Sequence, residues 1–483
     1  MKKFYFSLLA MMFIAAFSNT ISAAEDFWYN GIAYKIISEA LHTVEATTPS
    51  SGYTELGGPI TIPANVYNNN KTYVVTQIGA NAFQNCKAIT SVTFAKTLIT
   101  INLRAFYGCE NLAEIKFAPN GESALETIYS QAFYKTAVTT VTIPNGVKTL
   151  GPNVFEECKK LTTASLPNSL TYCDGSIFQN CTSLKTVNIP TSLEGIPTYF
   201  CNNCTSLKSI TIPSNIKTIG PGAFRYTSLT SITIPNNVTK IGSEAFRGCT
   251  GLTTVTVPST VVETQNTPDG SHRGIFRDCT GLISANIQNN TIWLNEFNGC
   301  TSLKTVTIGR NLINFYHNDN NEPFDGCPIE TLTIGSNVAA DIALYPSASS
   351  TLKTLTLNDG VTDLPENAFK GCSALATVTL PSGLQSIGNS AFQNCTRMYD
   401  LIAKMPRPFA IDASVFSGVQ QHGYCDLHVP QGSKFRYEAM EVWKEFTAIT
   451  EDAGTGVKKG DVNGDGNVTI ADVVAVLNLM AEQ

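Results

Sequence analysis

Twelve residues near the C-terminus carry the oxygen ligands that a calcium ion needs. In segment 461–472, side-chain oxygens stand at positions one, three and five, a glycine stands at position six and a carboxylate at position twelve. Calcium takes about six to eight hard oxygen ligands around a sharp turn, and this spacing supplies them. The main-chain carbonyl of Asn467 and a water held by Thr469 would complete the set. The predicted ligands are Asp461, Asn463, Asp465, Asn467, Thr469 and Asp472.

An apolar face follows this loop, because Val473, Val476, Leu477 and Met480 recur at helical spacing. No helical pattern precedes the loop, and its last ligand is Asp rather than Glu, so the segment differs from an ordinary EF-hand. The alternative interpretation is a disordered tail rich in Asp, Asn and Gly. We predict a calcium-binding loop followed by a helix.

With these residues, segment 460–482 resembles one repeat of a dockerin, the calcium module that docks onto a cohesin of a partner protein. The resemblance implies that loop positions ten and eleven, Ile470 and Ala471, help to select that partner. Dockerins usually carry two packed repeats, whereas this sequence shows one. Calcium binding is therefore the firmer expectation, and cohesin binding rests on the resemblance alone.

The rest of the chain shows no catalytic pattern. It lacks a His-Glu-x-x-His pair, a Gly-x-Ser-x-Gly elbow and a phosphate-binding loop. Scattered carboxylates leave paired-carboxylate chemistry open. We expect a protein that is not an enzyme. The five histidines are His42, His272, His317, His422 and His428.

The N-terminus and the charge balance indicate an exported protein. Residues 1–24 combine Lys2 and Lys3, an apolar run over 8–17 and a small-residue site at 22–24, as a secretory signal peptide does. A lone membrane anchor is the alternative. No later apolar run is long enough to span a membrane. The net charge is −6 and no basic stripe occurs, so nucleic acid is not an expected partner.

Most of the chain repeats about every 23 residues, and a period in this range predicts a solenoid. Each unit has a small residue and Phe, then a Cys three residues later, then an apolar triplet such as Leu184, Val187 and Ile189, usually closed by Pro. The triplet predicts a strand with one buried face, stacked in parallel on its neighbours. We expect an Ile-Gly step, as in Ile241-Gly242, to turn the chain before the next Phe through a positive φ.

These units resemble the bacterial leucine-rich repeat group called BspA-like, whose pattern is Ile-Gly-x-x-Ala-Phe-x-x-Cys-x-x-Leu-x-x-Val-x-Ile-Pro. The resemblance covers roughly residues 75–420. It implies a β-rich leucine-rich repeat solenoid in a secreted or surface-displayed protein that adheres to host proteins or other cells. It names no ligand.

The chain has 14 cysteines, and eleven of them occupy the repeat position after Phe. An even number in an exported protein suggests disulfides, but side chains stacked in parallel are poorly aimed for that geometry. The position also accepts Thr136 and Val419, so we predict a column of free thiols that serve as small apolar fillers. Cys173, Cys201 and Cys425 lie outside the column and are better candidates for thiol chemistry.

Two surfaces could bind a ligand. One is a row of hydroxyls on the outward strand positions, although Thr is also an ordinary strand residue. The predicted pairs are Ser91/Thr93, Thr140/Thr142, Ser209/Thr211, Ser231/Thr233, Thr254/Thr256, Thr305/Thr307, Thr354/Thr356 and Thr377/Thr379.

The other surface is formed by insertions at 118–127, 259–274 and 315–323, which should emerge along one side. Tolerated drift in solvated loops is the alternative. The candidate ligand-binding residues of these insertions are Asp269, His272, Arg273, Tyr316, His317 and Asp319.

The expected organisation is a signal peptide at 1–24, an N-terminal cap at 25–75, the solenoid at 76–420, a capping unit at 421–450, a linker at 451–459 and the dockerin-like repeat at 460–483. We expect the capping unit to contain a strand at 427–430 and an amphipathic helix at 433–446. The predicted function is secreted or cell-surface binding of a host or bacterial protein or glycan. A structural spacer, or a non-catalytic component of a polysaccharide-degrading assembly, is the alternative.

Overall fold

The chain divides into two compact units. In this computed structural model, the first unit comprises Met1–Gly251 and Glu263–Ile275, and the second comprises Leu252–Val262 and Phe276–Gln483. The described residues are 25–119, 121–265, 273–288, 291–292, 296–309, 314–315, 324, 326–336, 350–419, 424–446 and 448–452.

The described part of the first unit contains four sheets. The first has β1 (Phe27–Tyr29), β2 (Ile32–Ser38), β3 (Thr43–Thr47), β5 (Asn65–Asn68), β6 (Lys71–Ile78), β8 (Thr100–Ile101), β10 (Thr127–Ile128), β12 (Thr149–Leu150) and β14 (Tyr172–Cys173). The second has β4 (Gly58–Ile62), β7 (Ile89–Phe94) and β9 (Glu114–Lys116), and the third has β11 (Thr140–Thr142), β13 (Thr163–Ser165) and β15 (Thr186–Val187). The fourth has β16 (Gly195–Ile196), β17 (Thr218–Ile219), β18 (Lys240–Gly242) and β20 (Glu263–Gln265).

The second unit is built in the same way around one long sheet. That sheet has β19 (Thr254–Val257), β21 (Ser284–Ile287), β23 (Thr305–Ile308), β25 (Thr331–Ser336), β26 (Thr354–Gly360), β28 (Thr377–Leu380), β30 (Asp400–Ala403), β31 (Asp426–Pro430) and β32 (Ala448–Asp452). Short pairs are formed by β22 (Thr291–Ile292) with β24 (Asn314–Phe315), and by β27 (Asp363–Leu364) with β29 (Ser386–Ile387). Among the described residues of this unit, the helical elements are α4 (Lys434–Glu438) and the 3-10 helix η1 (Trp443–Glu445).

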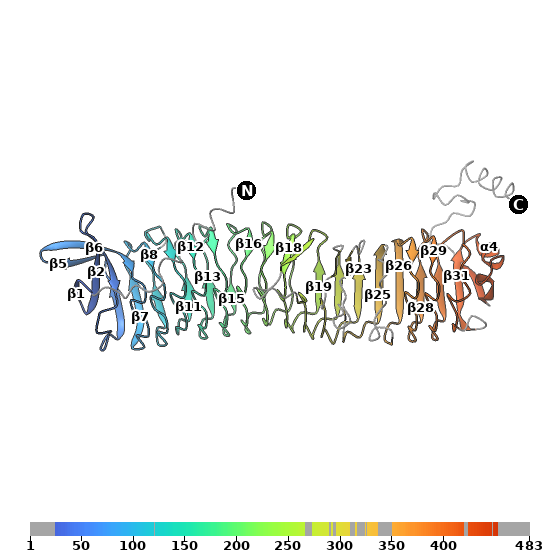
Figure 1. Ribbon diagram of the computed structural model, residues 1–483, viewed down its shortest axis with the longest axis horizontal. Helices are drawn as coiled ribbons and strands as arrows, with labels where there is room; N and C mark the ends of the chain where they lie inside the picture. Colours follow the sequence, from blue (N-terminus) through green and yellow to red (C-terminus); the bar gives the residue numbers. More distant parts are fainter. Residues whose placement is uncertain are drawn as a thin grey trace, which may run out of the picture. The chain divides into compact units, whose positions relative to one another are not determined.

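The described residues confirm the predicted parallel β-solenoid, which has about 14 coils and almost no helix. Each repeat forms one coil, and equivalent residues of successive coils pair, as Thr140 does with Thr163. Within each unit, the strands of successive coils lie side by side (Figure 1). The apolar triplet forms the longer strand, and a Pro such as Pro258 directly after β19 ends it because Pro lacks the N–H for a ladder. Residues 207–212 and 229–234 carry the triplet but are not strands.

The Ile of the Ile-Gly step ends a second, short strand, as Ile219 ends β17 and Ile387 ends β29, and the turn follows the glycine. These short strands form parallel ladders, such as β16 with β17 and β17 with β18. The glycine is needed for space, not for a positive φ. A Cβ on Gly242 would lie 2.2 Å from the main-chain nitrogen of Pro221, and one on Gly388 would lie 2.4 Å from that of Glu366. Any side chain here would separate neighbouring coils.

Columns of identical side chains fill the core. Phe83, Phe106, Phe133, Phe155 and Phe178 are fully buried. Their rings stack with centroids 4.9–5.8 Å apart and interplanar angles of 16° or less. Offset-stacked rings at this separation contribute about 0.5–1.5 kcal/mol per pair beyond the burial of apolar area.

Cys201 interrupts this column. Its N–H donates to the carbonyl of Ala223, just as the N–H of Phe155 donates to the carbonyl of Ile177, so Cys201 stands in the Phe position. Phe200 takes the small-residue position before it, and its ring meets Phe178 edge-on at 83°.

The two segments predicted to cap the solenoid contain strands and short helices. In the predicted N-terminal cap, β1 pairs with β2 and β2 with β3 in antiparallel orientation, and β3 pairs in parallel with β6. The predicted helix at 433–446 is wrong in extent, because the chain forms only α4 and η1 there. Phe435 is 53% exposed, and Tyr437 packs inward in its place. Strand β32 extends to Asp452, into the predicted linker.

No helix in the part of the chain that the structure describes is long and apolar enough to cross a membrane.

Candidate functional site

Most of the predicted site residues lie outside the described residues. These are the six calcium ligands, Ile470, Ala471, Asp269, His272, Tyr316, His317 and Asp319. Arg273 is the one predicted ligand-binding residue that the structure describes. Among the described residues, no group of three or more His, Cys, Asp or Glu side chains could hold a metal ion.

The hydroxyl row is present on the sheet of the second unit. Thr305 pairs with Thr331, Thr331 with Thr354 and Thr354 with Thr377, so one hydroxyl side chain follows another across the strands. Thr379 is a correction, because it is buried. It lies opposite Ile402, where the parallel row of hydroxyls ends.

A different face forms at the bend that contains the Phe of each repeat, which we call the Phe corner. Two residues four positions apart bracket the corner with left-handed φ angles, as Ser176 (60°) and Asn180 (61°) do. The second residue of each such pair donates its main-chain N–H to a carbonyl of the next coil. Asn180 donates to the carbonyl of Asn202 at 2.9 Å, and Asn203 donates to that of Arg225 at 2.7 Å.

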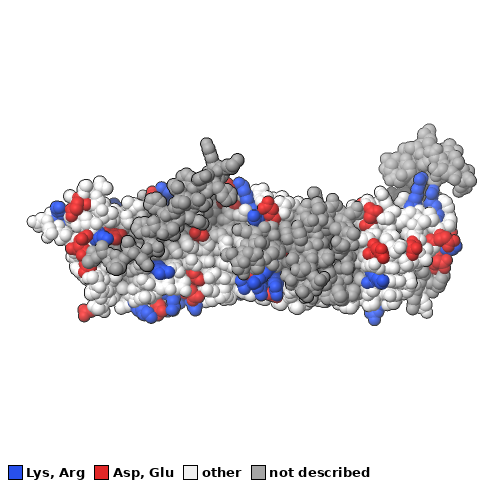
Figure 2. All heavy atoms as spheres, in the orientation of Figure 1, with Lys and Arg blue, Asp and Glu red and all other residues white. Residues whose placement is uncertain are grey.

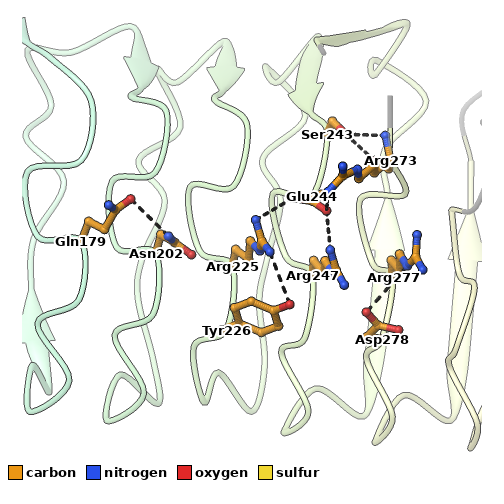
Figure 3. A network of polar contacts seen from close by, with 10 residues as sticks. All are labelled: Gln179, Asn202, Arg225, Tyr226, Ser243, Glu244, Arg247, Arg273, Arg277 and Asp278. Atoms are coloured by element: carbon orange, nitrogen blue, oxygen red, sulfur yellow. Dashed lines mark hydrogen bonds and ion pairs between the residues drawn. The ribbon is translucent and has the colours of Figure 1, made fainter. Parts of the chain in front are cut away.

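The residue directly after the Phe position points its side chain out of each corner and forms what we call the corner row. Its members bond from coil to coil. The Gln179 amide donates to Glu156 Oε1 at 2.6 Å, and the Asn202 amide donates to Gln179 Oε1 at 3.2 Å. Figure 3 shows the Asn202–Gln179 bond. In the first unit, the corner row consists of Gln84, Tyr107, Tyr134, Glu156, Gln179, Asn202, Arg225 and Arg247.

Three arginines of the first unit converge on one carboxylate (Figure 3). Arg225 Nη1 lies 2.9 Å from Glu244 Oε2, and Arg247 Nη1 lies 2.6 Å from Glu244 Oε1. Arg273 Nη1 lies 3.5 Å from the same Oε1. The main chain holds Arg273 in place, because its N–H donates to Ser243 Oγ at 2.6 Å. We call Arg225, Arg247, Arg273 and Glu244 the arginine cluster.

The cluster places its negative charge inside and its positive charges at the surface. The Glu244 side chain is 1% exposed, whereas those of Arg225, Arg247 and Arg273 are 23%, 17% and 42% exposed. A buried carboxylate is costly unless it is paired and hydrogen-bonded, so Glu244 holds the guanidinium groups beside it.

Tyr226 adds an aromatic side to the cluster. The Arg225 guanidinium lies 4.7 Å from the centroid of the Tyr226 ring, and that of Arg247 lies 5.7 Å away. A cation over an aromatic face gains about 0.5–2 kcal/mol. Tyr226 is 36% exposed, so part of its ring faces solvent beside the arginines.

Comparison with known proteins identifies the repeat. Six overlapping segments match the model described as BspA type Leucine rich repeat region, and together they span more than half of the chain. The matched segments are 76–208, 126–240, 176–269, 218–340, 272–399 and 341–424. The chain belongs to the BspA-type leucine-rich repeat family. No curated protein matches the sequence.

Several solved structures are similar to this BspA-type chain. A leucine-rich repeat protein from Bacteroides ovatus is 23% identical with a TM-score of 0.51, over 84% of this chain and 100% of the other. A leucine-rich cell surface protein from Faecalibacterium prausnitzii is 21% identical with a TM-score of 0.40, over 87% and 98%. A leucine-rich repeat protein from Eubacterium ventriosum is 20% identical with a TM-score of 0.38, over 76% and 93%. The first of these supports the fold.

The cysteines of these BspA-type repeats are free, as predicted. They are more than apolar fillers, however. Each of several column thiols donates to the carbonyl of the Phe one coil earlier, as Cys181 Sγ does to Phe155 at 3.0 Å and Cys204 Sγ does to Phe178 at 3.1 Å. Thr227, which the sequence analysis missed, takes the same position and donates to the carbonyl of Phe224 at 2.9 Å. The position therefore favours a small donor.

The thiols outside the column are poor nucleophiles, contrary to the prediction that they are candidates for chemistry. Burial raises the pKa of Cys173 and that of Cys425 to about 12, and it raises the pKa of Cys201 well above its usual range. The reactive species is the thiolate, and little of it forms at neutral pH when the pKa is this high.

Proposed function

We propose that this chain is a secreted or cell-surface binding protein, not an enzyme, and that the Phe corners of its solenoid engage an external protein or glycan. The single observation that carries the proposal is the arginine cluster, in which a fully buried carboxylate fixes three partly exposed guanidinium groups on a rigid scaffold. Arginine groups held in this way are preorganised for a ligand, which lowers the entropy cost of binding.

The solenoid supports this proposal because it repeats one backbone frame while the corner side chains change. Loops and corners on a rigid frame commonly carry recognition residues. The corner row includes Tyr, Glu, amide and Arg side chains along the first unit, whereas the core position beneath it is Phe in every coil except that of Cys201. A spacer that only sets distance would not need a buried anchor such as Glu244 beneath its surface arginines.

The test is a binding screen with the purified chain lacking residues 1–24, against glycans and extracellular matrix proteins. We expect saturable binding that weakens when Arg225 is replaced by Gln. Thr331→Lys together with Thr354→Lys serves as the comparison, because these changes disturb the strand face and leave the corners unchanged. Loss of binding only in the threonine variant would place recognition on the strand face. No binding to any probe would favour the spacer.

We also propose that segment 460–483 binds calcium and tethers the chain to a partner such as a cohesin. The support is the spacing of the six predicted ligands in the sequence. Calorimetric titration of the same chain with calcium should give heat that disappears in Asp461→Ala. Equal heats for the two proteins would remove the calcium proposal without affecting the solenoid.

A further inference from the structure

The corner face cannot recruit a peptide through its main chain. The N–H groups of Asn180, Asn203 and Tyr226 donate to carbonyls of the next coil at 2.7–2.9 Å. Binding by strand addition needs an open row of such groups. Recognition at this face therefore depends on side chains, and those side chains define the chemistry of the ligand.

The side chains next to the arginine cluster are amides. Asn202 stands one coil before Arg225 in the corner row, and Gln179 stands one coil before Asn202 (Figure 3). A primary amide both donates and accepts hydrogen bonds, as a sugar hydroxyl does, whereas arginine only donates and prefers oxyanions. Successive coils are spaced by about 4.8 Å. A polymer lying along the row would therefore meet neutral polar groups over two coils and cationic groups over the next two.

The distribution of charge along the corner row favours some polymeric ligands over others. Towards the N-terminus the amides end at Glu156, and Glu157 stands beside it with its own amide partner, Asn180, at 2.9 Å. A uniformly acidic peptide would meet these carboxylates unfavourably. An oligosaccharide that carries acid groups on some units and hydroxyls on all of them fits both parts of the row. On the face in view in Figure 2, charged residues occur in small groups among uncharged residues.

Building on the function proposed above, we infer that the corner row from Gln179 to Arg247, with Arg273, binds an acidic oligosaccharide. The sulfate or carboxylate groups lie at Arg225 and Arg247, and hydroxyls lie at the amides of Asn202 and Gln179. Glu244 acts as a positioning residue beneath the arginines. The bound segment covers only a few coils.

The experiment measures binding of the chain without residues 1–24 to four immobilised polymers. Heparin presents sulfates, polygalacturonate presents carboxylates, dextran is neutral and poly-glutamate is an acidic peptide. We expect binding to one or both acidic polysaccharides, weakened about tenfold or more in Arg225→Gln/Arg247→Gln, because the two substitutions remove charged hydrogen bonds to the acid groups of the ligand. Comparison of heparin with polygalacturonate decides which acid group is preferred.

The matched control changes the same net charge elsewhere. Lys404→Gln/Arg407→Gln removes two exposed positive charges of the second unit that lie outside the Phe corners, and it should change affinity less than about twofold. An equal loss in both double variants would mean nonspecific attraction and would overturn the inference. Preference for poly-glutamate over both polysaccharides would also overturn it.

Two further variants keep the test decisive if the double arginine variant does not fold. Asn202→Asp leaves the arginine cluster unchanged but places a negative charge in the row, so acidic polysaccharides should bind about tenfold less well, and thermal unfolding checks that this variant is folded. Arg273→Gln removes the most exposed arginine. If neither weakens binding, the inference fails. If a neutral glycan or a matrix protein binds instead, only this inference fails, whereas the absence of any ligand removes the proposed function as well.

Discussion

The Phe column and the corner row occupy adjacent positions in the chain and yet differ in how strictly they repeat. Phe133, Phe155 and Phe178 are identical and fully buried, while the residues that follow them are Tyr134, Glu156 and Gln179. The buried position faces the same neighbours in every coil, so packing fixes its identity. The row faces solvent on one side, so its identity is free to follow a ligand. Under the proposed function, stability and recognition are thus divided between neighbouring positions.

The largest effect is expected from breaking the buried member of such a pair. Phe155→Ala removes a ring that stacks on both Phe133 and Phe178, and we expect it to lower the free energy of unfolding by about 3–5 kcal/mol. Glu156→Ala changes the next residue and should cost about 1 kcal/mol, because it loses hydrogen bonds at a half-buried site. Urea denaturation of both variants measures the difference. Equal losses would mean that the two positions are not divided in this way.

A second prediction restores the column where it is interrupted. Cys201→Phe alone places a ring beside Phe200 and should destabilise the chain by about 1–3 kcal/mol through overpacking. Adding Phe200→Ala recreates the Ala-Phe order of the other coils and should recover most of that loss. The recovery is the coupling energy of a double-mutant cycle followed by thermal unfolding. No coupling between the two changes would show that Cys201 does not occupy the Phe position.

The sequence predicted the column far better than the row, for a physical reason. Phe, Cys and the apolar triplet recur at one period, so their stacking follows from the spacing alone. The arginine cluster joins Arg225, Arg247 and Arg273 from three coils to a single Glu244. No local pattern marks such a partnership, although two arginines directly after the Phe positions of successive repeats were a usable signal.

Two misjudged details show where spacing is insufficient. The spacing predicts a positive φ at the glycine of the Ile-Gly step, but contact with the preceding coil decides its identity, as at Gly242. The spacing predicts an apolar filler at the Cys position, but Thr227 shows that a donor to a carbonyl is also favoured. Both requirements come from a neighbouring coil, which a single repeat does not display.

A third prediction tests the donor role of the Cys column. Cys181→Val keeps an apolar side chain but removes the thiol that donates to the Phe155 carbonyl, which keeps the N–H of Cys158, and it should lower the free energy of unfolding by about 1 kcal/mol. Cys181→Thr should cost less, because Thr136 and Thr227 already donate at this position, to the Phe carbonyl of their own coil. Thermal unfolding ranks the variants. Greater stability in the Val variant than in the Thr variant would restore the view of a purely apolar filler.

The smallest effect on stability is expected at the exposed ion pairs. These pairs also connect neighbouring coils, but they lie at the surface in contact with water. Glu110 lies 3.0 Å from Lys135 and 3.1 Å from Lys87, and hydrogen bonds from these two lysines lower the pKa of Glu110. A carboxyl with a lowered pKa in the folded state stabilises the fold above its unfolded pKa, and that contribution is lost as the pH falls through the folded value. Glu110→Gln should therefore flatten the acid side of the stability profile slightly, with no change near neutral pH beyond the loss of the pairs themselves. Added salt should shrink the difference from the parent protein, because dissolved ions and solvent screen exposed pairs.

Glu330 of the second unit lies between Lys304 and Lys353 and should behave in the same way as Glu110. Urea midpoints from about pH 3 to 6 measure both variants. If either variant lost as much free energy of unfolding as Phe155→Ala, surface ion pairs would stabilise the solenoid as strongly as its core does, which would contradict the comparison between the Phe column and the surface.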